Sequence, residues 1–271
     1  MKLLKWCCVL SVVGLTGCAS MSSDRTSAAL KELAPTGKLR VAIGVSPAPS
    51  AFYAIKDATT GKFRGVTVDL GAALAQKLGV PVEFVPYLAS GEIQAAADSG
   101  VWDVTFMPVD EERKKIMDFG SPYHLLQSTY LVPEGSPVKS IADANAAGVR
   151  IVGIANTATF RASNRASPNA VHTAAAGVDE AIEIMRAGKA NAIALGRESL
   201  GGVAAKLPGS RILDGGFLNS TTAVAVPKGK PAALAYVAAL VEAAKASGLV
   251  RRAFDDVGLN NAVVAPPGMQ P

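Results

Sequence analysis

The sequence has few of the residues on which common site chemistries depend. Among its 271 residues are three cysteines and two histidines, and only 18% of residues are charged. The cysteines, Cys7, Cys8 and Cys18, all fall within the first eighteen positions, so they cannot form a disulfide or zinc framework along the chain. His124 and His172 lack the close spacing of a metal-binding motif. We therefore expect no metal and no cofactor.

Other absences narrow the class of function. The chain has no phosphate-binding glycine motif, no serine nucleophile elbow and no placed cysteine nucleophile. Its formal net charge is +5, but the basic residues are scattered along the chain, so we expect no nucleic-acid partner. A composition that is 49% hydrophobic and 6% aromatic, and rich in alanine, is typical of an α/β globular protein.

The N-terminus carries a specific motif. Lys2 and Lys5 precede an apolar run, Trp6–Leu15, which is too short to span a bilayer, and Thr16 and Gly17 then precede Cys18. This arrangement resembles a bacterial lipoprotein signal peptide. A buried N-terminal helix with chance cysteines is the alternative.

The lipoprotein resemblance divides the start of the chain and implies its location. Residues 1–17 would be the signal peptide, and residues 18–37 the lipidated Cys18 and a tether. The protein would then lie in the periplasm or cell envelope, held to a membrane through a lipid at Cys18. The choice between inner and outer membrane stays open.

Farther on, short β-branched segments alternate with alanine-rich helical segments. Such alternation predicts parallel sheets with helices on both faces. The expected helices are Val68–Leu78, Glu92–Ala97, Asp179–Ala187 and one that begins at Pro231 and ends near Gly248. The expected strands are Leu39–Ile43, Val82–Val85, Trp102–Phe106, Tyr130–Val132, Arg150–Ile154, Ala192–Leu195 and Thr222–Val226.

The order of these segments is similar to that of a known family. Its landmarks run from Lys38–Gly44 through Phe52, Gly61–Gly65, Val68–Leu70, Gly79–Phe84 and Ser99–Asp103 to Glu112, Arg113 and Asp118–Tyr123. In this the chain resembles the solute-binding proteins of ABC importers, in the family of the polar amino-acid binding proteins. The resemblance spans Gly37 to Leu259.

The resemblance implies the two-lobed periplasmic binding protein type II fold, an α/β architecture with two hinge crossings and a ligand in the interlobe cleft. Lobe 1 would comprise residues 38–126 and 220–260, lobe 2 residues 127–219, and residues 261–271 a C-terminal tail. A monomer is expected that captures a small carboxylate-bearing solute, an organic anion or an amino-acid-like molecule, by lobe closure and delivers it to an ABC permease in the inner membrane.

In lobe 1 the resemblance makes Arg113 the clamp for the solute's carboxylate, because a guanidinium fork donates two parallel hydrogen bonds to a carboxylate. From spacing alone, Arg113 could instead pair with Asp110, three residues earlier. The other expected first-lobe residues of the cleft are Phe52, Tyr53, Ser90, Gly91 and Asp110.

In lobe 2 the family's acid for an α-ammonium group should follow the strand Ala192–Leu195, where this chain has Gly196 and Arg197. We therefore expect an organic anion, with one acidic group met by Arg113 and a second by Arg197. Arg197 could equally be a surface charge beside Glu198, and Asp110 or Glu198 could replace the missing acid. The loop with Asn156 and Thr159 would complete the site at a helix N-terminus.

Two other classes of function stay open. Some proteins of this fold are dehydratases of prephenate-like substrates, for which Glu198, Asp110 and Glu92 are the only nearby acids that could act as a proton donor. A ligand-sensing lipoprotein that does not transport is the third class. The sequence favours a binding protein that is not an enzyme, because no catalytic group is evident.

Overall fold

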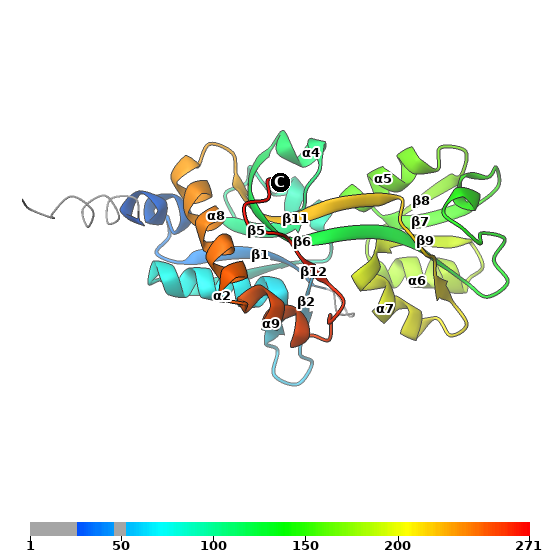
Figure 1. The fold of residues 1–271 in the computed structure, drawn as a ribbon, viewed down its shortest axis with the longest axis horizontal. Coiled ribbons are helices and arrows are strands. Elements are labelled where there is room, and N and C mark those ends of the chain that lie inside the picture. Colours follow the sequence, from blue (N-terminus) through cyan, green and yellow to red (C-terminus); the bar gives the residue numbers. More distant parts are fainter. Residues whose placement is uncertain (1–25, 46–52) are drawn as a thin grey trace, which may run out of the picture.

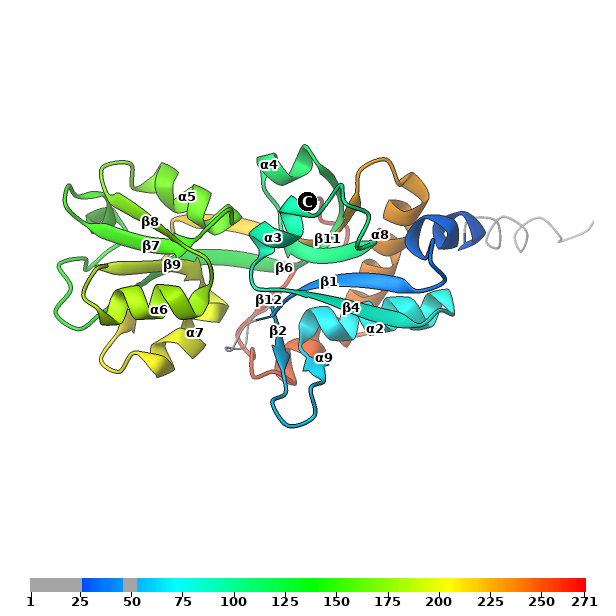
Figure 2. The same cartoon turned by 180° about the vertical axis from the view of Figure 1, so that it is seen from behind.

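The computed structural model describes residues 26–45 and 53–271, and shows two α/β lobes joined side by side (Figures 1 and 2). The predicted signal peptide, Cys18 and Phe52 lie outside the described residues. Two long strands, β6 (Met117–Val132) and β11 (Leu218–Pro227), run from one lobe into the other (Figure 1). The predicted two-lobed α/β fold is confirmed.

Lobe 1 is formed by the chain before β6 and the chain after β11. Its core packs Leu70 and Leu74 of one helix and Val237 and Phe254 of two others against the sheet, and all four side chains are buried. Its elements are β1 (Leu39–Val45), β2 (Tyr53–Lys56), β3 (Phe63–Arg64), α2 (Val66–Leu78), β4 (Val82–Tyr87), α3 (Ser90–Ala95), β5 (Val104–Pro108), α4 (Glu111–Lys114), α8 (Pro231–Ala246), α9 (Leu249–Asp255) and β12 (Val263–Val264).

Lobe 2 is the continuous segment between the two long strands. Buried Ile182 and Val203 lie in a cluster on one face of its sheet, and Tyr130 and Leu213 lie in another cluster. Its elements are a 3-10 helix (Ala142–Asn145), β7 (Arg150–Ile154), α5 (Ala158–Ala166), β8 (Val171–Ala175), α6 (Val178–Arg186), β9 (Ala192–Gly196), α7 (Arg197–Lys206) and β10 (Arg211–Ile212).

One sheet runs through both lobes. Its strand order is β3-β2-β1-β5-β11-β6-β9-β7-β8, with β4 paired to β1 and with β10 and β12 paired to β6. Within each lobe the neighbours β1–β4, β1–β5, β7–β8 and β7–β9 are parallel, as strand–helix alternation predicts. The hinge strands β6 and β11 are antiparallel to each other.

The hinge was the part of the sheet that the pattern predicted least well. Only Tyr130–Val132 was expected as strand, whereas β6 extends over 16 residues. Gly120 and Pro122 lie inside β6 and interrupt its hydrophobic pattern, and proline also removes a hydrogen-bond donor from the ladder. The register of β11 shifts around Ala223, which pairs with Pro122, so the ladder bends where the donor is missing.

Both ends of the described chain pack onto lobe 1. Residues 26–33, expected to be part of a tether, are helical, and Ala29 and Leu33 are fully buried in the lobe 1 core. Their apolar side chains make this segment part of the globular domain. At the other end, β12 pairs with β6 at Leu125 and His124, so part of the expected C-terminal tail is a strand on the hinge.

Within residues 26–45 and 53–271, no single helix is long and apolar enough to cross a membrane. The pair α8 and α9 meets the criteria of length and composition only when taken together, and the two helices meet at a bend of 70°. The same residues contain no cluster of three or more His, Cys, Asp or Glu side chains suited to a metal ion.

A buried ion pair fixes the start of β1 to the start of β5. The Asp103 side chain is fully buried and accepts hydrogen bonds from Arg40 at the backbone N (3.0 Å), Nε (2.9 Å) and Nη2 (2.7 Å). The hydrogen bond to Asp103 raises the pKa of Arg40 further above its usual range. The carboxylate thus holds two neighbouring strands in register.

We predict that Asp103→Ala lowers the free energy of unfolding by about 3–5 kcal/mol, because it leaves the Arg40 cation largely buried without its partner. Urea unfolding followed by circular dichroism measures this change. The matched control is Glu83→Ala, which removes a half-exposed partner of Lys38 and should cost less than about 1 kcal/mol. Equal costs for the two variants would contradict the prediction.

Candidate functional site

The two lobes meet where several strands end. Pro108 ends β5, Thr157 and Ala158 follow β7, and Leu195 and Gly196 end β9. All of these residues line one small cavity between the lobes, together with Ser90, Thr159 and Ser199. In α/β sheets, loops at the carboxyl ends of strands carry the groups that bind ligands. The geometry therefore makes this junction the candidate functional site.

Arg113 lies fully buried at the lobe 1 side of the junction. Its guanidinium donates to Ser90 Oγ (2.8 Å) through Nη2, to the Pro108 carbonyl (2.8 Å) through Nη1 and to Gln94 Oε1 (3.2 Å) through Nε. The ring-bound backbone of Pro108, which has no N–H to donate, thus contributes its carbonyl instead. These contacts hold the positive charge of Arg113 beside Ser90, which lines the small cavity.

Asp110 connects Arg113 to the other lobe. It is the N-cap of α4, and its Oδ1 accepts the Arg113 backbone N–H at 2.9 Å. Its Oδ2 pairs with the guanidinium of Arg161, which belongs to α5 of lobe 2. Arg161 also donates to the Asn156 carbonyl at 3.0 Å through Nη1. Asp110 thus caps α4 at the backbone of Arg113 and forms its side-chain ion pair with Arg161 of the other lobe. The alternative was an ion pair between the side chains of Asp110 and Arg113.

The backbones of the lobes approach each other closely at Gly91. A Cβ at Gly91 would lie 2.7 Å from the Ala155 carbonyl oxygen and 2.8 Å from Cβ of Asn156, closer than real contacts allow. Asn156 itself has a φ of 57°, in the left-handed region that asparagine tolerates better than most residues. Glycine at position 91 therefore permits the observed contact between α3 and the loop after β7.

The start of α5 presents hydroxyl groups at the same junction. Thr157 caps the helix and accepts the Phe160 N–H at 3.1 Å, and Thr159 hydrogen-bonds with Ser128 of the hinge strand β6 at 3.2 Å. Both threonines are buried. A helix N-terminus carries partial positive charge, which favours anions nearby.

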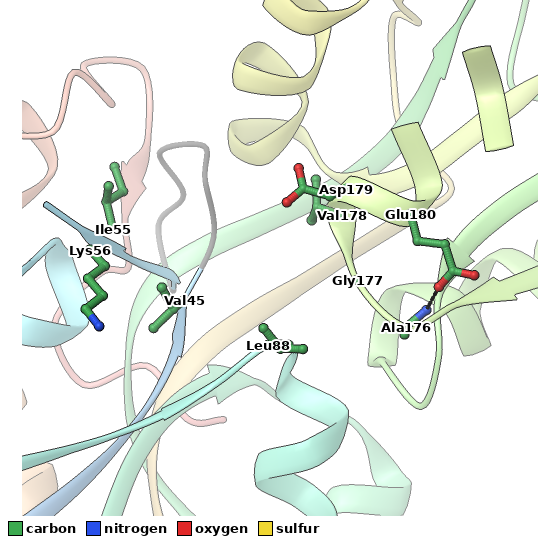
Figure 3. Close-up of a pocket in the computed structure, with 9 residues that line it drawn as sticks. All are labelled: Val45, Ile55, Lys56, Leu88, Ala176, Gly177, Val178, Asp179 and Glu180. Atoms are coloured by element: carbon green, nitrogen blue, oxygen red, sulfur yellow. Dashed lines mark hydrogen bonds between the residues drawn. The ribbon is translucent and has the colours of Figure 1, made fainter. Parts of the chain in front are cut away.

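Two cavities of different size lie between the lobes. The cavity beside Ser90 and Thr159 has a volume of only about 10 Å³, which is room for about one water molecule. The other cavity has a volume of about 650 Å³ and lies between Val45, Ile55, Lys56 and Leu88 of lobe 1 and residues 176–180 of lobe 2 (Figure 3). Leu88 lines the large cavity, and Ser90, two residues later, lines the small one. The small cavity has no room for an organic solute in this arrangement of the lobes.

Arg197 lies at the hinge in this structure. Its guanidinium donates to Gln127 Oε1 (2.7 Å) and to the carbonyls of Leu213 (2.9 Å) and Gly215 (2.5 Å). A separate cavity of about 570 Å³ is lined by Arg197, Gln127 and residues 219–221. Arg197 is thus not brought together with Arg113.

Glu198, the acid next to Arg197, also has a partner in the hinge. Glu198 Oε1 lies 3.1 Å from Nε2 of the buried His124 on β6. The pKa of Tyr123 is raised well above its usual value, mainly by burial and to a smaller extent by the negative charge of Glu198. Glu198 therefore belongs to the packing of the hinge, and not to the junction at Arg113.

The structure brings together six of the residues singled out in the sequence, Ser90, Gly91, Asp110, Arg113, Asn156 and Thr159. Tyr53 opens β2, with its backbone beside Gly44 of β1. The residue that sequence reasoning missed is Arg161. A signal was available, because a cation in the first turns of a helix opposes the helix dipole and so indicates another role.

Comparison with known proteins agrees with this geometry. Residues 39–256 match the model of the bacterial extracellular solute-binding proteins, family 3. The chain belongs to this family. A glutamine-binding protein of Geobacillus stearothermophilus is 26% identical over 233 residues, which are 77% of this chain and 85% of that protein. The ABC transporter glutamine-binding protein GlnH of Bacillus subtilis strain 168 is 23% identical over 247 residues, 87% of this chain and 85% of that one.

Solved structures agree. The crystal structure of an ancestral amino-acid-binding protein, AncCDT-1, described as a precursor of cyclohexadienyl dehydratase, superposes with a TM-score of 0.72 at 28% identity. The match covers 84% of this chain and 98% of that one. The chain is thus a solute-binding protein of the amino-acid ABC transporter type. The three similar proteins described above are all named as binding proteins.

We predict that Gly91→Ala opens the cleft, because its new methyl group cannot fit against Ala155 and Asn156. Small-angle X-ray scattering without added solute should give a larger radius of gyration than for the unmodified protein. Alanine stabilises a helix by roughly 0.5–1 kcal/mol relative to glycine, so local unfolding is not the expected cause. Gly201→Ala in α7, where a Cβ meets open space, is the control. An unchanged radius in both variants would contradict the prediction.

Proposed function

We propose that the protein captures a small carboxylate-bearing solute between its lobes, outside the cytoplasm, for an ABC importer. The observation that carries the proposal is the buried guanidinium of Arg113 at the interlobe junction, oriented by Ser90, Gln94 and Pro108. A charge-assisted bond from such a group to a carboxylate is strong, because the site is shielded from water. The relatives named as glutamine-binding proteins support the same class of ligand, because glutamine carries a carboxylate.

Lobe closure is the mechanism by which such a solute is held. A solute that contacts both lobes stabilises the closed arrangement by its higher affinity for that arrangement. Arg113 and Ser90 act from lobe 1, and Asn156, Thr159 and the start of α5 act from lobe 2. The 650 Å³ space beside Leu88 lies within the range of about 300–1,000 Å³ of ordinary ligand pockets and gives the solute a path of entry.

The partner is an ABC permease in the inner membrane, which recognises the closed form. The lipid at Cys18 keeps the protein close to the membrane, and the monomer is the working unit. Eight residues after Cys18, the chain enters the helix whose Ala29 and Leu33 are buried in lobe 1. The tether between lipid and domain is therefore short, at most about 30 Å when fully extended.

We predict that Cys18→Ser abolishes incorporation of radiolabelled palmitate and moves the protein from the membrane fraction to the soluble fraction of the envelope. Cys8→Ser, which changes a cysteine within the apolar run of the signal, is the control and should leave labelling intact. Persistent labelling of Cys18→Ser would remove the lipid anchor from the proposed function.

For solute binding, we predict that Arg113→Lys lowers affinity for carboxylates at least tenfold. Lysine keeps the charge but cannot donate the two parallel hydrogen bonds of a guanidinium. The measurement is isothermal titration calorimetry with a solute first identified by its thermal shift. At a hundredfold excess over its Kd, a bound solute adds about 2.7 kcal/mol to stability.

Lys114→Met is the matched control, because Lys114 is a half-exposed neighbour in α4 paired with Glu111 at 3.1 Å. Its affinity should equal that of the unmodified protein. A thermal unfolding curve for each variant separates loss of binding from loss of fold. Retention of affinity by a folded Arg113→Lys variant would refute the clamp.

A further inference from the structure

The ion pair of Asp110 and Arg161 joins α4 of lobe 1 to α5 of lobe 2. The two side chains are largely buried, with 12% and 23% of their surfaces exposed. By contrast, all the residues that line the small cavity beside them, from Ser90 and Pro108 to Gly196 and Ser199, are uncharged. Among the described residues, Arg113, Asp110 and Arg161 are the charged residues linked to one another here, whereas Lys56, Asp179 and Glu180 line the larger cavity.

Arg161 has unused capacity to donate hydrogen bonds. In the described part of the chain, its Nη2 meets Asp110 and its Nη1 meets the Asn156 carbonyl. A guanidinium carries five N–H groups. Arg161 is also the fourth residue of α5, where the helix dipole disfavours a cation, and α5 has no acidic residue in its first turn to offset it. A cation at this position is suited to receive an anion.

Asp110 can release Arg161 without losing its place in lobe 1. Its two oxygens have separate tasks, since Oδ1 caps α4 at the Arg113 N–H and Oδ2 meets Arg161. When the lobes separate, only the contact of Oδ2 is broken, and the cap can persist. In this structure the Asp110 carboxylate occupies the position beside Arg161 that the carboxylate of a solute could occupy instead.

We infer that Arg161 is a second anion-binding group of the cleft, opposite Arg113, and that the cleft selects small dicarboxylates. One carboxylate binds at Arg113 in lobe 1, and the other replaces Asp110 at Arg161 in lobe 2. This inference rests on the proposed function, and it transfers to Arg161 the role that the sequence suggested for Arg197.

The charge of these three groups favours an anion over a neutral or cationic solute. Arg113 and Arg161 together with Asp110 carry a net charge of +1, which one carboxylate neutralises, so a second carboxylate is favoured by the N–H donors of Arg161 that are free in the described part of the chain and not by net charge. A neutral α-amino acid brings an ammonium group, for which the end of β9 offers Gly196, followed by Arg197, in place of an acid. A solute with one carboxylate leaves Arg161 paired with Asp110 and spans the lobes less well.

The test is calorimetry on the full chain, purified in detergent, with dicarboxylates and monocarboxylates of equal length: succinate with butyrate, and glutarate with pentanoate. The unmodified chain should bind the dicarboxylate of each pair more tightly. Arg161→Met should lose about ten- to hundredfold more affinity for dicarboxylates than for monocarboxylates, the range of a hydrogen bond to a charged group, because only a dicarboxylate binds Arg161 directly.

Arg165→Met is the matched control, because Arg165 is an exposed arginine one turn later on the same helix. It removes the same charge from α5 and should keep the preference for dicarboxylates. If Arg161→Met keeps that preference too, the inference is overturned, although a loss of affinity in Arg113→Lys would still support the proposed function. If the unmodified chain binds no carboxylate, the proposed function and the inference are both overturned.

Asp110→Asn supplies an independent readout, because asparagine keeps an oxygen that can cap α4 but loses the charge that competes for Arg161. Affinity for dicarboxylates should rise in this variant. Unchanged or weaker binding in a folded Asp110→Asn variant would overturn the idea that the two carboxylates compete for one arginine.

Discussion

The carboxylate of Asp110 is the group on which the interlobe junction depends. Through Oδ1 it fixes the first turn of α4, and so the backbone from which Arg113 reaches Ser90. Through Oδ2 it holds Arg161 of the opposite lobe. Because an ion pair contributes most where water is excluded, the close approach at Gly91 and the burial of Thr157 and Thr159 strengthen this contact.

The remaining structure presents this junction without taking part in it. The hydrophobic clusters lie mainly within one lobe, although Ala89 of lobe 1 belongs to a cluster of lobe 2 residues, so most of each interior is formed without the other lobe. The lobes are joined by β6 and β11, which pair with each other from Leu218 to Pro227 of β11. In the proposed closure, a polar contact such as that of Asp110 with Arg161 is one that a solute can exchange, and so shift the balance between two arrangements of the lobes.

Patterns within short segments predicted much of this fold. Arg150–Ile154 is a strand at the expected residues, and Val68–Leu78 lies within α2, because buried residues recur there at regular intervals. The hinge strand β6 was mostly missed, because Gly120 and Pro122 break its pattern and only pairing with β11 compensates for the missing donor. Local propensity does not contain that compensation.

The same distinction holds for the site. Arg113, Ser90 and Thr159 were identified from the resemblance to the family, which aligns the loops that follow the predicted strands, and not from local pattern alone. A shift of one position along the chain turns a side chain toward a cleft or away from it, and the sequence does not fix this direction. The Arg197 side chain points away from the junction, where Gln127 and two carbonyls hold it. The role of Arg161 depends on contact with Asp110, 51 residues earlier, and no local pattern encodes such a contact.

The position of β11 has a consequence for how the chain acquires its fold. This strand lies between β5 and β6 in the sheet, and its residues come after the whole of lobe 2. A ribosome therefore releases every residue of lobe 2 before the sheet of lobe 1 can close. Lobe 2 is continuous and can assemble early, whereas the lobe 1 strands up to β5 must wait, with an open sheet edge at β5, for β11 in the last fifth of the chain.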